Sequence, residues 1–305
     1  MTSSALALPQ ATAWRTAWIT DRTPVFVVVA ALMVFWYLAA FVMNAPQVRD
    51  AFERNDIKYT LGDVIAGTME GDRPIVPAPH QVVIELYDSI LGYPLDSPRN
   101  LAYHAWVTLS ATAVGFALGA VFGIVLAILI VHLRTLEKSL LPWIICSQMV
   151  PILAIAPIII VVFGAIGIRG LLPKSIISAY LCFFPVTIGM VKGLSSPDPI
   201  QLDLMRTWSA TKLQVFWKLR WPSSIPYLFT SLKVSVTISL VGAIVAELPT
   251  GAQAGIGARL LTGSYYGQTV QIWAALVAAA VIATILIGII DVIAKWTARR
   301  MGATT

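Results

Sequence analysis

The chain has 305 residues, of which 58 % are hydrophobic and only 12 % are charged, and its formal net charge is +6. A soluble domain carries about 25 % charged residues, and a chain with about half that share cannot cover a water-exposed surface. The composition excludes a soluble enzyme, a nucleic-acid-binding module and a disordered tail, and it indicates a membrane protein with several spans.

Before the first apolar stretch, Trp14, Arg15 and Trp18 place two indole rings four residues apart. Indole rings are favoured in the headgroup layer of a membrane. Residues 1–23 are therefore predicted to form a cytoplasmic tail that ends in an interfacial helix. A disordered tail up to Gln10 is an open alternative for the first residues.

Six apolar stretches are long enough to cross a bilayer as helices. A hydrocarbon core about 30 Å thick needs about 20 apolar helical residues, and an unpaired backbone amide costs several kcal/mol in lipid. The first stretch follows Asp21 and Arg22 and has no small-residue cleavage pattern behind it, so we interpret it as an uncleaved anchor. The stretches are residues 24–43, 105–131, 140–164, 175–191, 227–246 and 270–294.

Residues 44–104 form a long segment between the first and second spans, and we predict that it is extracytoplasmic. Apolar residues recur at helical spacing after Pro79, with Glu85 and Asp88 on the opposite face. We predict an amphipathic helix that caps the spans, and a role in admitting solute stays open. The apolar residues of this helix are Val82, Val83, Leu86, Tyr87, Ile90 and Leu91.

Two prolines interrupt the third apolar stretch. Pro151 and Pro157 each remove a helix hydrogen bond, and the carbonyls that they free must face protein or a cavity. We interpret this pattern as the wall of a translocation pathway, with a packing kink as an equally supported alternative. Ser147, Gln148 and Thr187 are polar side chains at similar depth and complete this predicted wall.

Residues 192–226, which we call the aromatic loop, hold three tryptophans in a segment too charged to span a membrane. Pro199 suits the first turn of a helix, and a break is predicted at Ser209 and Ala210. Aromatic side chains on an exposed helix are typical anchors for a groove of a partner protein. The sequence therefore predicts a docking surface here.

A second helix is predicted to begin at Thr211, which forms a capping box with Gln214, and to end at Trp221 and Pro222. Charged residues in the loop are candidates for pairing with the partner. The residues predicted to dock a partner are Asp203, Arg206, Thr207, Trp208, Ser209, Ala210, Leu213, Phe216, Trp217 and Pro222.

Ionisable residues in or near membrane spans are costly and are candidates for function. Glu247 follows the fifth span directly. It either lines the pathway or caps the end of the span by accepting hydrogen bonds from the backbone or from Arg259, and both interpretations stay open. A pair between Lys233 and Asp291 is conceivable.

The aromatic loop resembles the signature of ABC-importer permeases, which reads Glu-Ala-Ala, three residues, Gly, nine residues, Ile, one residue, Leu-Pro. In this sequence, Asp203 occupies the position of the Glu and Ser209 that of the Gly. Trp221 occupies the position of the Leu that precedes the final Pro, which is Pro222. Other segments are similar to the nitrate/sulfonate/taurine branch, which includes relatives that handle pyrimidine precursors. These segments are residues 76–79, 108–123, 151–167 and 247–257.

This resemblance implies an all-α protein with the smaller (type I, MetI-like) fold of six transmembrane helices. It implies a second permease subunit (an identical copy or a paralogue), two cytoplasmic ATPase subunits and an extracytoplasmic substrate-binding protein. The expected solute is small and anionic or heterocyclic, such as a sulfonate, nitrate, taurine or a pyrimidine.

The sequence contains no Gly-x4-Gly-Lys-Ser/Thr motif, so the chain lacks this means of holding nucleotide phosphates. Two cysteines and three histidines lie apart without ligand spacing. We therefore expect no catalytic residue, metal or cofactor in this chain, and we expect ATP and Mg²⁺ on the partner ATPase. A stand-alone secondary transporter and an intramembrane enzyme are the competing classes.

Basic residues next to the spans predict that both termini are cytoplasmic. The resemblance implies that the membrane is the inner membrane of a bacterium. The predicted organisation is a tail with an interfacial helix (1–23), a first span (24–43), an extracytoplasmic segment (44–104), a five-span core (105–294) that contains the aromatic loop, and a cytoplasmic tail (295–305).

Overall fold

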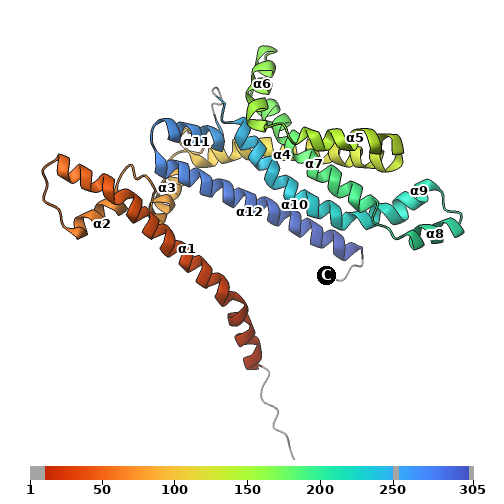
Figure 1. The fold of residues 1–305 in the computed structure, drawn as a ribbon, viewed down its shortest axis with the longest axis horizontal. Helices are drawn as coiled ribbons and strands as arrows, with labels where there is room; N and C mark the ends of the chain where they lie inside the picture. The colour runs from red at the N-terminus through yellow and green to blue at the C-terminus, as the bar shows by residue number, and fades with distance from the viewer. Residues whose placement is uncertain (1–10, 250–253, 302–305) are drawn as a thin grey trace, which may run out of the picture. The chain divides into compact units, whose positions relative to one another are not determined.

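The structure is a computed structural model that describes residues 11–249 and 254–301, with side chains from residue 23 onward (Figure 1). Every regular element in this part of the chain is helical, which confirms the predicted class. The long helices are α1 (Ala11–Arg54), α4 (Leu101–His132), α7 (Leu171–Leu194), α10 (Trp221–Ala246) and α12 (Thr269–Arg300). The shorter ones are α2 (Leu61–Glu70), α3 (Pro79–Leu91), α5 (Arg134–Ser147), α6 (Ile152–Ala165), α8 (Pro199–Thr207), α9 (Lys212–Val215), the π-helix η1 (Phe216–Arg220) and α11 (Ile256–Tyr265).

Residues 1–85 form one compact unit and residues 86–305 another. In the first unit, α1 is a single helix that includes both the predicted interfacial segment and the first span. The side chains of Trp14 and Trp18, like the tail up to Gln10, lie outside the described residues. Asn44 of α1 holds the turn before α3, because its side chain accepts from the Ile75 N–H at 2.8 Å and donates to the Val76 carbonyl at 2.8 Å.

The core of the second unit is a layer in which α7 packs between α4 and α10. Small residues line the contact, as is usual where membrane helices approach closely. A Cβ at Gly115 of α4 would lie 2.5 Å from the Ser178 Cβ of α7. The Ser178 hydroxyl in turn donates to the Ser239 carbonyl of α10 at 2.7 Å, so a hydrogen bond between buried groups joins α7 to α10.

The third predicted span is not one straight helix. It is divided into α5 and α6, which meet at an angle of 94°, so the described chain has five candidate spans, or six if the bent pair counts as one. Helix α5 ends at Ser147, and Pro151 is the N-cap of α6. In Figure 1, α6 projects from the layer of long helices, and its Ala156 packs against Ile177 of α7 and Ala246 of α10.

The aromatic loop leads into α10 without a break. Helices α9, η1 and α10 form one continuous span from Lys212 to Ala246, so the predicted end at Trp221 and Pro222 is wrong. The π-turn lets the Trp221 N–H bond to the Phe216 carbonyl five residues back. Pro222 follows directly after this π-turn, as the second residue of α10.

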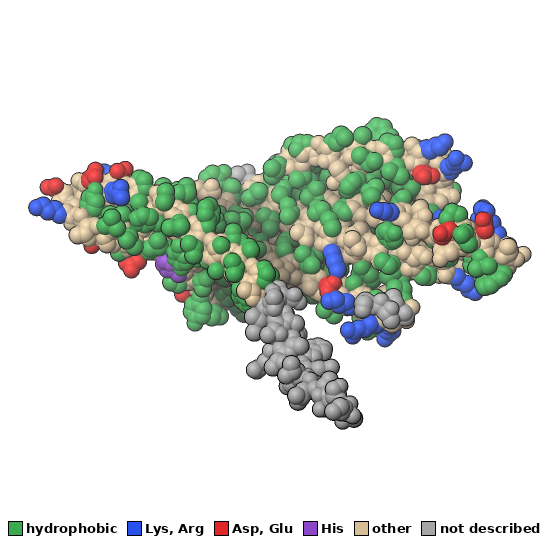
Figure 2. All heavy atoms as spheres, turned by 60° about the horizontal axis from the view of Figure 1, so that its bottom comes forward, with side chains coloured by type: hydrophobic (Ala, Val, Ile, Leu, Met, Phe, Trp, Pro, Cys, Tyr) green, Lys and Arg blue, Asp and Glu red, His purple; other side chains and the backbone are tan. Residues whose placement is uncertain are grey.

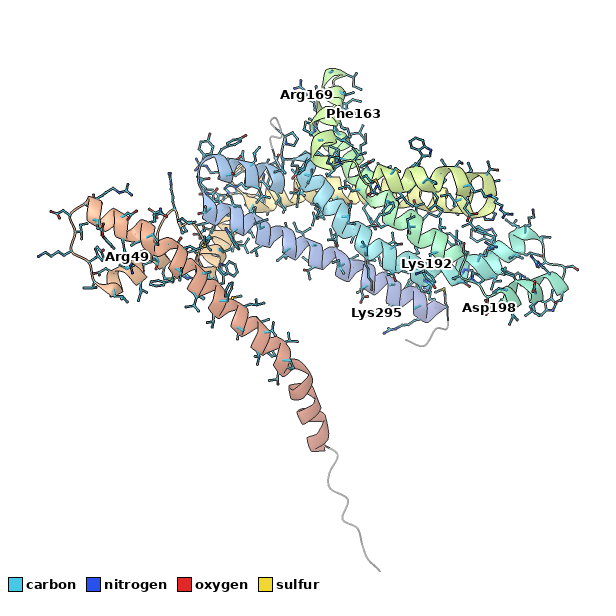
Figure 3. The ribbon with its side chains drawn as sticks, in the orientation of Figure 1. Arg49, Phe163, Arg169, Lys192, Asp198 and Lys295 are labelled. Carbon is cyan, nitrogen blue, oxygen red and sulfur yellow. The ribbon has the colours of Figure 1, made fainter. Side chains whose placement is uncertain are left out.

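Charged side chains gather at the end of the second unit that carries the aromatic loop, and hydrophobic side chains cover most of the rest of the face seen in Figure 2. Figure 3 places Lys192, Asp198 and Lys295 at this same end. Phe163 and Arg169 lie away from it, on α6 and the turn that follows. The helix α12 continues to Arg300, so much of the predicted C-terminal tail is helical, and residues 302–305 are outside the described part.

Candidate functional sites: the aromatic loop and the Glu247 network

The first helix of the aromatic loop begins where it is predicted. Asp198 is its N-cap and accepts from the Ile200 N–H at 2.9 Å, while the Asp198 N–H donates to the side-chain oxygen of Gln201 at 3.2 Å. Pro199 occupies the first helical position. A local capping box thus fixes the start of α8.

The predicted turn between the two loop helices is also present. Ser209 has a φ of 51°, a left-handed conformation that glycine adopts most easily. The Ala210 N–H bonds to the Met205 carbonyl at 3.0 Å and closes the turn. After it, Thr211 and Gln214 form the predicted capping box of α9, with a 2.8 Å bond from the Thr211 N–H to the side-chain oxygen (Oε1) of Gln214.

Large apolar side chains of the aromatic loop are exposed. The side chain of Trp208 is 72 % exposed and that of Trp217 is 56 % exposed. Burying an indole ring removes a large apolar area from water, and the described residues leave both of these rings largely uncovered. The exposed apolar surface of the loop consists of Ile200, Leu204, Trp208, Leu213 and Trp217.

Phe216, which the sequence groups with the docking residues, is not part of this surface. Its side chain is only 7 % exposed and packs among residues of α4 and α7. The ring meets His132 edge-on at 5.2 Å between ring centroids. The π-turn that begins at Phe216 directs this ring inward while its neighbour Trp217 stays outside.

The two predicted docking charges pair with each other. Arg206 donates to the Asp203 carboxylate at 2.9 Å, and both side chains are exposed. The Thr207 hydroxyl donates to the Leu204 carbonyl of its own helix at 2.7 Å. Because the pair is solvated, it contributes little to the stability of α8 and leaves both charges accessible to a partner.

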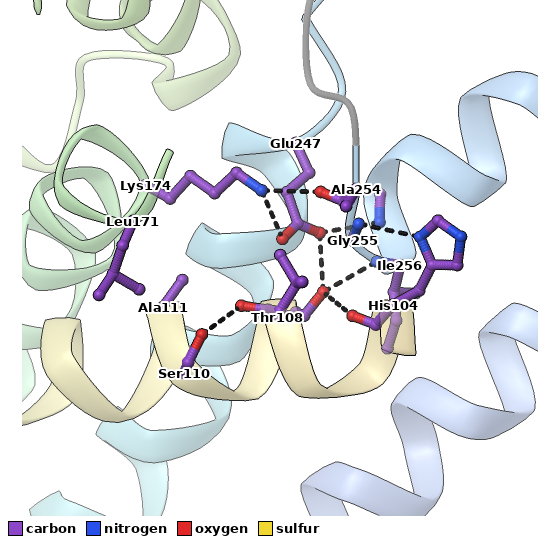
Figure 4. A network of polar contacts seen from close by, with 12 residues as sticks. His104, Thr108, Ser110, Ala111, Leu171, Lys174, Glu247, Ala254, Gly255 and Ile256 are labelled. Atoms are coloured by element: carbon purple, nitrogen blue, oxygen red, sulfur yellow. Dashed lines mark hydrogen bonds and ion pairs between the residues drawn. The ribbon is translucent and has the colours of Figure 1, made fainter. Parts of the chain in front are cut away.

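At the opposite end of α10, Glu247 is fully buried, and both of its carboxylate oxygens accept hydrogen bonds (Figure 4). Oε1 lies 3.2 Å from the Lys174 ammonium of α7. Oε2 accepts from the Thr108 hydroxyl of α4 at 2.8 Å and from the Gly257 N–H of α11 at 3.0 Å. The capping interpretation of Glu247 is thus present in the structure, with Gly257 and not Arg259 as the donor. One side chain therefore joins three other helices to the end of α10.

Further bonds extend this cluster, which we call the Glu247 network. Lys174 also donates to the Ala254 carbonyl at 2.8 Å, and the Ile256 N–H donates to the Thr108 hydroxyl at 2.8 Å. His104 Nδ1 accepts from the Gly255 N–H at 3.0 Å, so this nitrogen carries no proton and the ring is neutral. These bonds hold Ala254, Gly255 and Ile256 at the start of α11.

Two glycines are required by this geometry. Gly255 has a φ of 126°, and a Cβ there would collide with the Glu247 carboxylate. A Cβ at Gly257 would lie 2.7 Å from the Glu247 Cβ and closer still to the Ile244 carbonyl oxygen. The segment can pass over the carboxylate only because both positions lack a side chain.

Burial raises the pKa of the Glu247 carboxyl above its ordinary value, and the Lys174 ammonium acts in the opposite direction. The Gly257 N–H and the Thr108 hydroxyl also favour the charged carboxylate. Removal of any one of these donors therefore leaves a buried charge less compensated.

The other predicted pathway residues do not join this network. Ser147 and Gln148 lie at the bend between α5 and α6, and Pro151 and Pro157 are exposed. Thr187, in contrast, is fully buried in α7 and donates to the Phe183 carbonyl of its own helix at 2.8 Å. The conceivable pair of Lys233 and Asp291 is formed, and Lys295 bonds to the second oxygen of Asp291 at 2.7 Å.

Residues 119–303 match the family described as the binding-protein-dependent transport system inner membrane component. The chain belongs to this family. Its members are non-catalytic permeases of ABC importers, which work with ATPase and substrate-binding partners. The resemblance predicted from the aromatic loop and the flanking segments is confirmed, and the permease is a multi-pass protein of the inner membrane.

Three relatives illustrate the range of the family. The permease is 32 % identical to the formylaminopyrimidine transport permease of Halalkalibacterium halodurans over 63 % of this chain and 72 % of that one. It is 28 % identical to a riboflavin transport permease of Chloroflexus aurantiacus, over 73 % and 81 % of the two chains. It is 27 % identical to a putative aliphatic sulfonate transport permease of Bacillus subtilis, over 73 % and 76 %.

Sequence reasoning missed most partners of Glu247 in the permease. Lys174 and Thr108 lie 73 and 139 positions from it in the chain, and no periodicity links such distant residues. The available signal was a lysine within the first turn of an apolar helix, which needs a counter-charge when it is buried.

Proposed function

We propose that the permease is one of two membrane subunits that together form the pathway of an ATP-driven importer. The importer also has two cytoplasmic ATPase subunits, and the aromatic loop of the permease is the surface to which they bind. The observation that carries this proposal is the exposed apolar surface of the loop, where Trp208 and Trp217 are largely uncovered and capping boxes fix the starts of α8 and α9. In this assembly ATP and Mg²⁺ bind the ATPase subunits and no cofactor binds the permease.

The proposed orientation puts the aromatic loop and both termini in the cytoplasm. Lys192 and Lys295 support it, because they share one end of the second unit and basic residues favour the cytoplasmic side of a membrane. The Glu247 network then lies toward the extracytoplasmic side, where a substrate-binding protein delivers the solute.

The bend between α5 and α6 is the part of the permease that we propose as pathway wall. Ser147, Gln148 and Pro151 lie at the bend, and Pro157 is exposed on α6. Irregular backbone within a membrane is tolerated where it lines a cavity or a second subunit. Thr187 is not included, because it is buried within the permease.

The solute that we propose is small and either heterocyclic or anionic. Relatives named for formylaminopyrimidine, riboflavin and aliphatic sulfonates support this class. Competitive uptake by cells that contain the complete importer, with a radiolabelled pyrimidine and a radiolabelled sulfonate as probes, separates the two alternatives.

The docking role is tested by purification of the importer through a tag on the permease. We expect the double variant Trp208→Ala/Trp217→Ala to lose the ATPase subunits while it still inserts in the membrane, because two central anchors are removed. Trp106→Ala is the matched control, since this indole is similarly exposed but lies on α4. Retention of the ATPase by the double variant, or uptake by the permease alone in liposomes without ATP, contradicts the proposal.

A further inference from the structure

We propose that Glu247 is a positioning residue that fastens α11 to the end of α10, so that α11 moves with α10 when the ATPase subunits pull on the aromatic loop. This inference rests on the proposed function. It adds the route by which a movement at one end of the permease reaches the other.

The helix that begins in the aromatic loop provides a continuous connection. The continuous span from Lys212 to Ala246 has 35 residues, which corresponds to a length of about 52 Å. Trp217 of the exposed apolar surface lies near one end, and Glu247 follows the other end directly. A force applied to the indole therefore displaces the carboxylate without an intervening loop.

The Glu247 network transmits this displacement because its hydrogen bonds connect the end of α10 directly to α11. Both carboxylate oxygens are used, and the bond from Gly257 at 3.0 Å runs directly from the first turn of α11. Thr108 also accepts from the Ile256 N–H at 2.8 Å. A bond that slips would leave a buried charge without its donors, so the network favours discrete arrangements over gradual sliding.

Close packing adds a second restraint that involves no charge. Gly257 lies so near α10 that a Cβ there would meet the Ile244 carbonyl oxygen and the Glu247 Cβ. Gly257→Ala must therefore push α11 away from α10 while it leaves every ionisable group unchanged. Gly257→Ala is therefore a variant that weakens the same contact between α10 and α11 through a residue of α11.

The test uses the complete importer in nanodiscs, with both native cysteines replaced by Cys146→Ser and Cys182→Ala and with a reporter thiol introduced by Tyr265→Cys. Tyr265 ends α11 and is exposed. The rate of maleimide labelling is measured without nucleotide and after trapping with ATP and vanadate. We call the importer with these three substitutions the parent, and we expect its labelling rate to change when the nucleotide is trapped.

We expect Glu247→Gln and Gly257→Ala each to keep the ATPase subunits bound but to reduce the nucleotide-dependent change at least about fivefold, a coupling of ordinary size. Gly288→Ala of α12 is the matched control, because no described atom outside its helix lies within 4 Å of the added Cβ. It should retain the change found in the parent.

A parent without a nucleotide-dependent change, or a full change in both variants, overturns the inference. If the ATPase subunits fail to bind even the parent, the proposed function is wrong as well, so the two failures are distinguishable. Should Glu247→Gln fail to fold, Gly257→Ala decides the question alone.

Discussion

The Tyr180 hydroxyl of α7 donates to the Ser147 carbonyl at the end of α5. In a continuous helix this carbonyl would accept from the N–H four residues later, but that residue is Pro151, which has no N–H. Tyr180 thus replaces the helical bond that the proline removes. The bend between α5 and α6 is held by a side chain from a different helix.

Replacement of this hydroxyl should loosen the bend. We expect Tyr180→Phe to lower the stability of the permease by about 1–3 kcal/mol, since a partly buried carbonyl loses its donor, and to speed maleimide labelling of the adjacent Cys146, which is exposed. Thermal unfolding in detergent and labelling kinetics measure the two effects. Tyr265→Phe, at an exposed tyrosine, is the control, and equal results for both variants would contradict this role of Tyr180.

The left-handed turn at Ser209 makes a prediction about docking. Ser209→Gly should keep or strengthen ATPase binding, whereas Ser209→Val should weaken it by about 1–3 kcal/mol, because a β-branched residue is strained at a φ of 51°. Titration of the purified permease with ATPase subunits measures the difference. Asp56→Val imposes the same strain in the first unit, at a φ of 53°, and should leave ATPase binding unchanged. Equal ATPase binding by Ser209→Val and the unaltered permease would show that the conformation of this turn does not affect docking.

Asp291 bonds to two lysines, so replacement of Asp291 should destabilise the permease more than replacement of one of the lysines. Lys233→Met leaves Asp291 paired with Lys295 at 2.7 Å, but Asp291→Asn leaves two ammonium groups close together without a counter-charge. We expect Asp291→Asn to unfold at a lower temperature than Lys233→Met. The double variant should recover part of the loss, and an order opposite to this one would count against the pair.

The capping box of α2 predicts a pH dependence outside the spans. Bonds from the Thr60 N–H at 2.8 Å and from its hydroxyl lower the pKa of Asp63 below its ordinary value. A carboxyl with a lowered pKa in the folded state adds stability above its unfolded pKa of about 4 and loses it as the pH falls through the folded value.

Amide hydrogen exchange in residues 61–70, corrected for the intrinsic rate, should therefore accelerate as the pH drops below about 4. In Asp63→Asn the exchange should be fast at all pH values and show no such acid step. A step of equal size in the variant would assign the effect to another group.

Short-range features of the permease could be predicted from the sequence. The start of α8 at Pro199, the turn at Ser209 and the capping box of Thr211 all depend on bonds between residues at most five positions apart. The apolar stretches likewise predict helices, since the hydrophobic effect acts on each stretch by itself. These features predicted the helical class and the apolar spans.

Only the tertiary structure decided which side chains face inward and which distant residues meet. Phe216 and Trp217 are adjacent aromatic residues, yet the packing of α4 and α7 buries the first and leaves the second exposed. Glu247 finds its counter-charge on Lys174, 73 positions away. Such contacts arise from the close approach of helices, which depends on the shapes of all the side chains between them and not on any local pattern.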